Sequence, residues 1–334
     1  MGRVTPSALL FAALVGVGCE EKGEETTIRP AAPPPAQDAA APGGPAAEAP
    51  QPTAEARPAT EPLEPAERRP APLPDPAAAR LRSAEKGFIV VTREDCLRGR
   101  RSYDLVVHFH GVADAVERQW NAARLDGVLA VANAGTWGRD YKAVYEQRGA
   151  YQRLLDRVDA QLAELCPERP ARVGRVALSG WSAGYAAIRA MLRDVGNEPV
   201  DAVLLSDGIH ASLVGGAGRA VLPADVEPFV AFGQLARRGE KLLSITHSAI
   251  RTPDYASTTE TTDYLLERLG LPRNPARGAT PTGDRVELRS EVTEQGFRLR
   301  GYSGESGPEH GWHLHALDET LFADLRAWWS RPIP

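Results

Sequence analysis

The chain has 334 residues, with 39 basic and 44 acidic side chains and a formal net charge of −5. This mildly acidic balance argues against a nucleic-acid partner, because proteins that bind nucleic acids concentrate Lys and Arg on one surface. The length and the 43% share of hydrophobic residues suffice for one large domain with a substantial core.

Residues 1–18 have the charge and hydropathy pattern of an export signal. Arg3 supplies a positive start, residues 8–18 form an apolar stretch too short to span a bilayer, and small residues precede Cys19. The segment resembles a bacterial lipoprotein signal, in which cleavage before the cysteine is coupled to its lipidation. We therefore expect an exported protein of the bacterial cell envelope, anchored to a membrane through lipidated Cys19. Gly16 stands where such signals usually carry an aliphatic residue, so secretion without a lipid is the alternative.

Residues 19–82 have the composition of a disordered tether. Fifteen of the 28 prolines lie between residues 30 and 76, and no aromatic residue occurs between Phe11 and Phe88. Such a segment cannot bury enough apolar surface to fold. We expect it to hold a folded domain, residues 83–334, away from a membrane, and a purely connecting role is the alternative.

The remaining residues alternate between apolar runs and amphipathic segments. Apolar runs of this length are typical of buried parallel strands. The predicted strands are residues 103–109, 127–132, 173–179, 200–206, 242–246 and 297–302. Helical spacing marks residues 151–165, the segment after residue 184 and the closing segment 321–329. This alternation predicts an α/β fold with a doubly wound, mostly parallel sheet, because parallel neighbours require a crossover connection.

Residues 180–184, Gly-Trp-Ser-Ala-Gly, match the pattern G-x-S-x-G between a predicted strand and a predicted helix. In a nucleophile elbow the chain turns sharply at this point and raises the serine hydroxyl out of the sheet. Glycines flank the serine because side chains there would collide across the turn. The pattern alone is weak evidence, but its context makes Ser182 a candidate nucleophile rather than a small turn residue.

The order of these features resembles the α/β-hydrolase superfamily. The resemblance begins at about residue 103 and extends to the C-terminus. It depends on His110-Gly111 after an early strand, the motif at 180–184 and a histidine after the last strand, all in the family's characteristic order. It implies an α/β-hydrolase fold and a serine hydrolase, but it does not identify the substrate.

The resemblance also implies the parts of an acyl-transfer site. Ser182 requires a histidine that takes its proton and a carboxylate that orients this histidine. The oxyanion of the tetrahedral intermediate requires donors that are already in place. By resemblance these donors are the backbone N–H of Ala183 and one from the turn formed by Gly111 and Val112.

Two candidates exist for the histidine and two for the acid. Residues 310–317 resemble the histidine-bearing segment of many superfamily esterases, so we predict His310 as the base, with His313 as the alternative and packing roles for both as a third possibility. Asp207 stands where some lipases place the acid, and Asp254 lies after the next strand, where most members place it. We predict Asp207, although an Asp-Gly pair is also an ordinary turn.

Other polar residues lie near the predicted strand ends. We expect His210 and His247 to support the site or to lie at the surface. Asn133, Trp137 and Tyr141 follow the second predicted strand, where they could contact substrate or pack within a loop.

Cys96 and Cys166 are expected to form a disulfide. They precede the strands that lead to His110 and to Ser182, and in the resembled fold those strands are neighbours. Both cysteines would then lie at the same, non-catalytic end of the sheet, in a protein exported to an oxidising compartment.

The predicted activity is hydrolysis of a carboxylic ester, carried by a small molecule or a polysaccharide, without a cofactor. Amide hydrolysis by the same triad is an alternative. So is a metal-dependent hydrolase, because His108 and His110 share one strand face and three histidines cluster at 310, 313 and 315. Against a metal, no His-Glu-x-x-His spacing or Cys pair supports a zinc site. The third alternative is a non-catalytic binding lipoprotein.

Overall fold

The computed structural model describes residues 80–170, 172–215, 218–278 and 286–331. The predicted signal, Cys19 and residues 20–79 of the predicted tether lie outside these described residues, so the predictions about them stay predictions. The first strand, β1, begins at Arg80, within the range predicted as tether, and residues 80–82 therefore belong to the folded domain.

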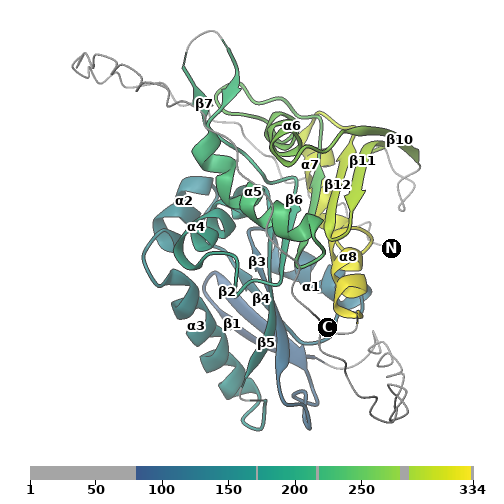
Figure 1. Ribbon diagram of the computed structural model, residues 1–334. Helices are drawn as coiled ribbons and strands as arrows, with labels where there is room; N and C mark the ends of the chain where they lie inside the picture. Colours follow the sequence, from purple (N-terminus) through teal and green to yellow (C-terminus); the bar gives the residue numbers. More distant parts are fainter. Residues whose placement is uncertain (1–79, 171, 216–217, 279–285, 332–334) are drawn as a thin grey trace, which may run out of the picture. The chain divides into compact units, whose positions relative to one another are not determined.

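A 10-stranded sheet forms the centre of the domain (Figure 1), in the order β1-β2-β4-β3-β5-β6-β9-β12-β11-β10. Neighbours from β4 to β12 are parallel, and the outer strands pair antiparallel. The parallel block consists of the predicted strands, with bounds β3 (Tyr103–Phe109), β4 (Val128–Ala132), β5 (Val173–Trp181), β6 (Ala202–Ser206), β9 (Leu242–His247) and β12 (Phe297–Tyr302). The prediction of a doubly wound, mostly parallel α/β-hydrolase fold is confirmed.

The sequence pattern did not predict the strands outside this block. They are β1 (Arg80–Glu85), β2 (Phe88–Arg93), β10 (Asn274–Gly278), β11 (Leu288–Glu294) and the separate hairpin β7 (Leu213–Val214) and β8 (Ala220–Val221). Apart from β2, they are short or expose alternate residues, so they lack the continuous apolar run of a strand buried on both faces.

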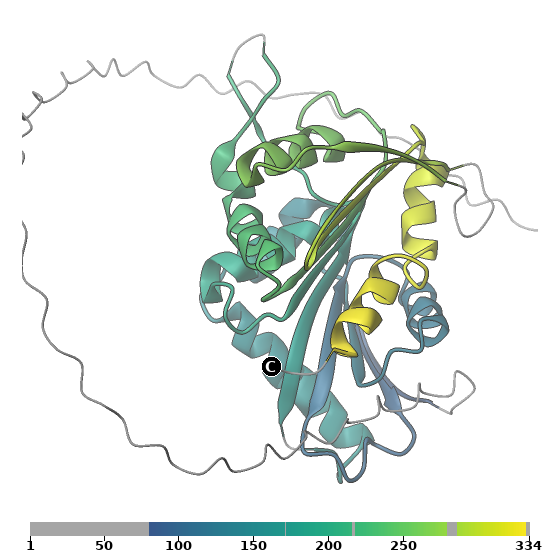
Figure 2. The same cartoon turned by 45° about the vertical axis from the view of Figure 1, so that its right-hand side comes forward.

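Helices cover both faces of the sheet (Figure 2). One layer contains α2 (Gly138–Tyr145), α3 (Ala150–Leu165), α4 (Tyr185–Val195), α5 (Pro223–Arg237) and α6 (Thr258–Leu269), and the other contains α1 (Ala113–Ala122), α7 (Gly307–His315) and α8 (Leu321–Trp329). Successive strand residues serve opposite layers: Val107 packs in the core under α3 and α4, whereas Val106 packs in the core under α1 and α8. Both faces are therefore buried, as in other sheets of parallel strands.

The strand order reverses at β3, and this reversal distinguishes one end of the sheet from the other. The chain runs from β3 outward to β4 and then returns past β3 to β5, so β3 lies between two strands that both follow it in sequence. In open α/β sheets, ligands bind at such a reversal, beyond the carboxyl ends of the strands. A functional site is therefore expected at that edge, which is the upper end of the domain in Figure 1.

A disulfide joins Cys96 to Cys166 with a Cα–Cα distance of 5.4 Å, as predicted. Cys96 lies in the loop before β3, and Cys166 caps the carboxyl end of α3 before β5. The bond therefore ties together the amino ends of two neighbouring strands, opposite the edge at which ligands are expected.

We expect replacement of both Cys96 and Cys166 by alanine to lower the free energy of unfolding. The bond closes a loop with a sequence separation of 70 residues, and loss of a closure of this length costs about 4 kcal/mol in the chain-entropy model. Urea unfolding in oxidising buffer measures the difference. A reductant should destabilise the wild type and leave the variant unchanged. Equal stability of the wild type and the variant in oxidising buffer would contradict the expectation.

Candidate active site

Ser182 occupies a strained turn between β5 and α4. Its φ is +48°, a left-handed conformation that is unusual for a residue with a side chain. The turn also brings two backbones together, since a Cβ on Gly184 would lie 2.1 Å from the carbonyl oxygen of Phe109. The second glycine of the motif is thus required by a close approach to β3, and the observed geometry is that of a nucleophile elbow.

Asp207 and Gly208 form a second tight turn at the end of β6, directly against the elbow. Asp207 has a φ of +40°. A Cβ on Gly208 would lie 2.4 Å from the carbonyl oxygen of Ser182 and 2.7 Å from its nitrogen. The Asp-Gly pair therefore does more than reverse the chain, because only glycine allows the backbone after Asp207 to touch the backbone of Ser182.

The Asp207 carboxylate is buried and fully engaged. One oxygen accepts hydrogen bonds from the Ser248 N–H at 2.8 Å and the Thr258 hydroxyl at 3.0 Å, and the other lies 2.7 Å from His310 Nδ1. Burial alone would raise the pKa of this carboxyl, but the neighbouring His313 and His310 and the hydrogen bonds from His310 and Ser248 lower it well below its usual range. Asp207 is therefore ionised, and His310 Nδ1 carries the proton that it donates to Asp207.

His310 projects from α7. Pro308 stands in the first turn, and Ser306 and Glu309 form a capping box at the helix start. The imidazole stacks on the indole of Trp181 at a ring distance of 4.7 Å, and Trp181 Nε1 donates to the His310 carbonyl at 3.1 Å. Trp181, the residue directly before Ser182, thus holds both the ring and the backbone of His310.

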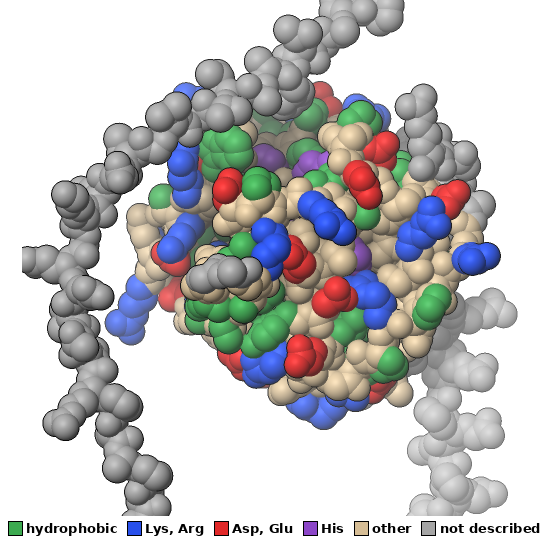
Figure 3. Space-filling model, turned by 90° about the horizontal axis from the view of Figure 1, so that it is seen from above, with side chains coloured by type: hydrophobic (Ala, Val, Ile, Leu, Met, Phe, Trp, Pro, Cys, Tyr) green, Lys and Arg blue, Asp and Glu red, His purple; other side chains and the backbone are tan. Residues whose placement is uncertain are grey.

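Ser182, Asp207 and His310 all line one cavity of about 270 Å³. Figure 3 shows histidine side chains in a hollow on this end of the molecule. Among the described residues, no hydrogen bond involves the Ser182 hydroxyl, so the structure brings Ser182 and His310 into one cavity without a bond between them. Such contacts are often long in ligand-free sites and shorten when substrate binds.

The residues predicted to donate to the oxyanion, Gly111, Val112 and Ala183, are not among those that line this cavity. Gly111 has a φ of +126°, and a Cβ there would lie 3.1 Å from Leu314 Cδ1. Val112 is 65% exposed. Within the described part of the chain, no hydrogen bond uses the N–H of Gly111, Val112 or Ala183. Ala183 also stands at the start of the helical segment that continues into α4, where the dipole favours negative charge.

Asn133, directly after β4, and Tyr141, in α2, hold the turn after β3 in place through hydrogen bonds. Asn133 donates to the Gly111 carbonyl at 3.0 Å, and the Tyr141 hydroxyl lies 3.0 Å from His110 Nδ1. His110 in turn stacks on the far side of Trp181 at 5.2 Å. Asn133 and Tyr141 are thus loop-positioning residues, whereas Trp137 is 62% exposed on the same edge.

The alternative triad members have other environments. His313 is buried and its Nδ1 lies 3.1 Å from the Thr246 hydroxyl, which turns the ring away from the cavity that Ser182 lines. Asp254 is exposed, in the loop after β9. Among the described residues, the structure therefore joins Asp207 to His310 by a hydrogen bond, and it joins neither His313 nor Asp254 to that pair in this way.

His247 is buried behind Asp207 and was expected only to support the site or lie at the surface. The Arg273 guanidinium, which can only donate, lies 2.9 Å from His247 Nε2. The proton must then sit on Nδ1, which donates to the Ser248 carbonyl at 2.9 Å. Since the Ser248 N–H bonds to Asp207, this pair of residues fixes a donor to the buried carboxylate. His210 does not support Asp207 in this way. Its Nδ1 lies 3.2 Å from the Ala256 carbonyl, and the residue lines the cavity.

The histidines of the metal alternative have separate partners. His108 is buried between the Ser179 hydroxyl, at 2.9 Å, and the His110 carbonyl, at 3.0 Å, and His315 is exposed. In the described ranges, no group of three or more His, Cys, Asp or Glu side chains is arranged to hold a metal ion.

No helix of these ranges is long and apolar enough to cross a bilayer.

No protein-family model and no curated protein sequence matches the chain. Among solved structures, it is similar to the poly(3-hydroxybutyrate) depolymerase LpqC from Bordetella parapertussis, with 15% identity over 72% of this chain and 89% of that chain and a TM-score of 0.34. An acetyl xylan esterase from Aspergillus awamori gives 9% identity, coverage of 68% and 93%, and a TM-score of 0.36. The siderophore hydrolase EstB from Aspergillus nidulans gives 17% identity, coverage of 79% and 99%, and a TM-score of 0.38. The residue roles proposed below depend on the geometry of this chain alone.

The buried histidines predict a loss of stability in acid. Burial lowers the pKa of His108 to about 3 and, with neighbouring charges, the pKa of His247 and His313 to about 4, against 6.5 for an exposed histidine. Below about pH 6.5 the unfolded chain therefore binds protons that the folded chain rejects, and each such proton steepens the fall in stability by about 1.4 kcal/mol per pH unit.

Urea unfolding between pH 7 and pH 5 tests this expectation. Stability should fall across that range in the wild type and fall less steeply in His108→Gln, which lacks one of the three groups. Identical slopes for the two proteins would contradict it.

Proposed function

We propose that this protein is a serine hydrolase that cleaves carboxylic esters through an acyl-enzyme intermediate. The observation that carries the proposal is the strained Ser182, which shares a cavity with a histidine hydrogen-bonded to a buried, ionised carboxylate. These are the groups that acyl transfer to a serine requires.

In the proposed mechanism, His310 acts as the base. Asp207 accepts the Nδ1 proton, which leaves His310 Nε2 unprotonated and able to take the proton of the Ser182 hydroxyl. Ser182 Oγ then attacks the ester carbonyl, and the N–H groups of Ala183 and of the Gly111–Val112 turn donate to the oxyanion. His310 returns its proton to the leaving alkoxide, and water hydrolyses the acyl-enzyme by the same steps in reverse order.

Trp181 has a proposed role in the same step. Its indole faces the His310 ring at 4.7 Å, and His310 becomes a cation when it takes the proton of Ser182. A cation on an aromatic face is stabilised by about 0.5–2 kcal/mol. Trp181 therefore stabilises the imidazolium. Its Nε1 hydrogen bond to the His310 carbonyl also holds α7 beside the turn that carries Ser182.

The cavity favours a small substrate group next to Ser182. Its volume of about 270 Å³ lies near the lower end of the range for small-molecule sites, which begins at about 300 Å³. The substrate is thus a short acyl ester of a small molecule or of a polysaccharide whose chain lies outside the cavity. Amide hydrolysis uses the same groups and is the second reaction to test.

We further propose that the domain is exported and held at the bacterial cell envelope by a lipid on Cys19. The support is the sequence pattern of residues 1–18 and the proline-rich composition of residues 19–82. A disulfide in the folded domain agrees with an oxidising compartment. The tether would let the active site reach substrates away from the membrane.

Kinetics of variants with p-nitrophenyl acetate, butyrate and octanoate test the proposed triad. Ser182→Ala and His310→Ala should each lower kcat by roughly 10⁴- to 10⁶-fold, and the double variant should be little worse, because these residues act as one unit. Asp207→Asn should retain more activity than either. Activity should be unchanged by a strong chelator.

Asp254→Asn is the matched control for the acid, because it removes an exposed carboxylate of the neighbouring loop. It should leave kcat within about twofold of the wild type, as expected for a surface change that touches no catalytic group. A larger loss in Asp254→Asn than in Asp207→Asn would overturn the assignment, as would an active Ser182→Ala protein.

Mass spectrometry of the protein from membranes of an expressing bacterium tests the anchor. The N-terminal residue should be Cys19 carrying acyl chains, and Cys19→Ser should move the protein to the soluble fraction. An unmodified N-terminus in a soluble wild-type protein would contradict lipidation.

A further inference from the structure

A second cavity, of about 710 Å³, opens beside the candidate active site. Thr252 and Glu305 line both this cavity and the smaller one that Ser182 lines. The two cavities are therefore contiguous, and a substrate held at Ser182 can extend past Glu305 into the larger one.

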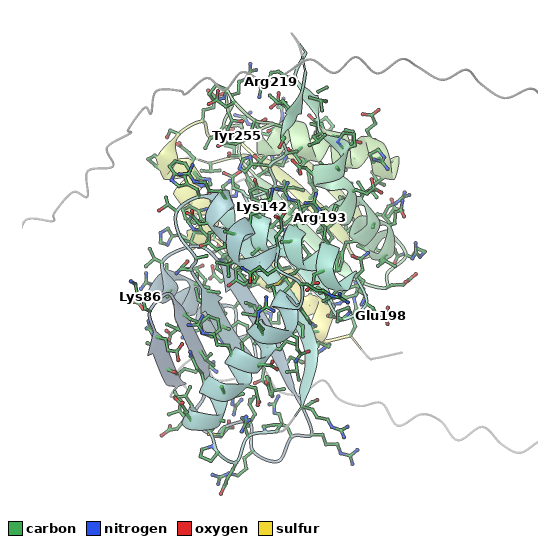
Figure 4. The ribbon with its side chains drawn as sticks, turned by 90° about the vertical axis from the view of Figure 1, so that its left-hand side faces the viewer. Lys86, Lys142, Arg193, Glu198, Arg219 and Tyr255 are labelled. Atoms are coloured by element: carbon green, nitrogen blue, oxygen red, sulfur yellow. A yellow bond between two sulfur atoms is a disulfide. The ribbon has the colours of Figure 1, made fainter. Side chains whose placement is uncertain are left out.

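Arg219 pins the loop that separates the two cavities. It forms hydrogen bonds at 2.6 and 2.9 Å with the Glu260 carboxylate and donates to the carbonyls of Thr252 at 2.7 Å and Tyr255 at 3.0 Å. Figure 4 shows Arg219 and Tyr255 near one another at this end of the domain. These bonds hold the loop in one conformation, and Arg219 and Glu260 already bind each other.

Hydroxyl groups around the second cavity also form hydrogen bonds within the protein. The Thr252 hydroxyl donates to the Tyr255 carbonyl, the Ser257 hydroxyl to Glu260, and the Thr259 hydroxyl to the Ser248 carbonyl. Two charged side chains that line the cavity differ: within the described ranges, Arg251 and Glu305 form neither an ion pair nor a hydrogen bond, and both are exposed. These two residues are available to bind a ligand.

The position of Glu305 assigns the second cavity to the leaving group. Glu305 directly precedes Ser306, the N-cap of the helix that carries His310. In the proposed mechanism His310 protonates the leaving oxygen, so the leaving group lies on the His310 side of the scissile bond.

Building on the proposed ester hydrolysis, we propose that the second cavity binds the leaving group and that Arg251 selects leaving groups carrying a carboxylate or another anionic group. The guanidinium offers two parallel donors that match a carboxylate, and no protein carboxylate occupies them. Glu305 lines both cavities, whereas Arg251 lines only the larger one, so the Glu305 carboxylate repels an anion on this path and limits the selection.

Matched aryl acetates test the inference. The two phenols carry a carboxylate or a carboxamide at the same ring position, so they differ in charge and little in shape. The measured quantity is the ratio of kcat/KM for the anionic ester to kcat/KM for the neutral one. Arg251→Gln should lower this ratio about 1.5- to fivefold, the size expected for one exposed charge pair. Glu305→Gln should raise it, and Arg251→Lys should restore part of it.

Three controls separate the inference from general effects of charge. Arg118→Gln removes an exposed arginine of α1 that lines neither cavity and forms no ion pair among the described residues, and it should not change the ratio. Adding salt should shrink the preference of the wild type, because exposed charges are screened. A second ester pair, with the carboxylate or carboxamide on the acyl group, should give a ratio that Arg251→Gln does not lower.

A ratio that is the same in Arg251→Gln and in the wild type would overturn the inference. So would a change confined to the acyl-side pair, which would place the anion in the other direction. If the wild type hydrolyses neither the neutral nor the anionic ester, the proposed ester hydrolysis fails first and this inference falls with it.

Discussion

The buried charge of Asp207 is the constraint on which the site depends. A carboxylate removed from water is stable only when its oxygens are hydrogen-bonded, and these bonds come from three separate places: the residue after β9, the first turn of α6, and α7. The carboxyl ends of β6 and β9, the start of α6 and α7 must therefore meet at one point. Because Gly208 touches the Ser182 backbone, the same point is tied to the elbow.

The residues behind Asp207 extend this constraint to the edge of the sheet. Arg273, just before β10, fixes the tautomer of His247, and His247 holds the carbonyl of the residue whose N–H reaches Asp207. Arg273 is itself held by Asp263 and Ser290. The antiparallel strands added after β9 thus support the site, although they contribute no group to the cavity that Ser182 lines.

The sequence pattern was sufficient for the parallel block and for the elbow, because both depend on local features: continuous apolar runs and two glycines around a serine. The partner of His310 could not be chosen in this way, since Asp207 is 103 residues away and its Asp-Gly pair is common in turns. The helix α7 could have been recognised from Ser306, Pro308 and Glu309, and β2 from the apolar residues 88–91. Trp181, Arg219 and Arg273 contact residues far away in the sequence, so no local sequence pattern could predict these contacts.

The central claim is that Ser182 is a nucleophile activated by His310. Its most direct test is covalent labelling of the folded protein with a fluorophosphonate, followed by peptide mass spectrometry. The account predicts one phosphonyl group per chain, on Ser182, with labelling slowed in His310→Ala and abolished by prior unfolding. A folded wild-type protein that takes up no label, or one labelled on a different serine, would contradict the account.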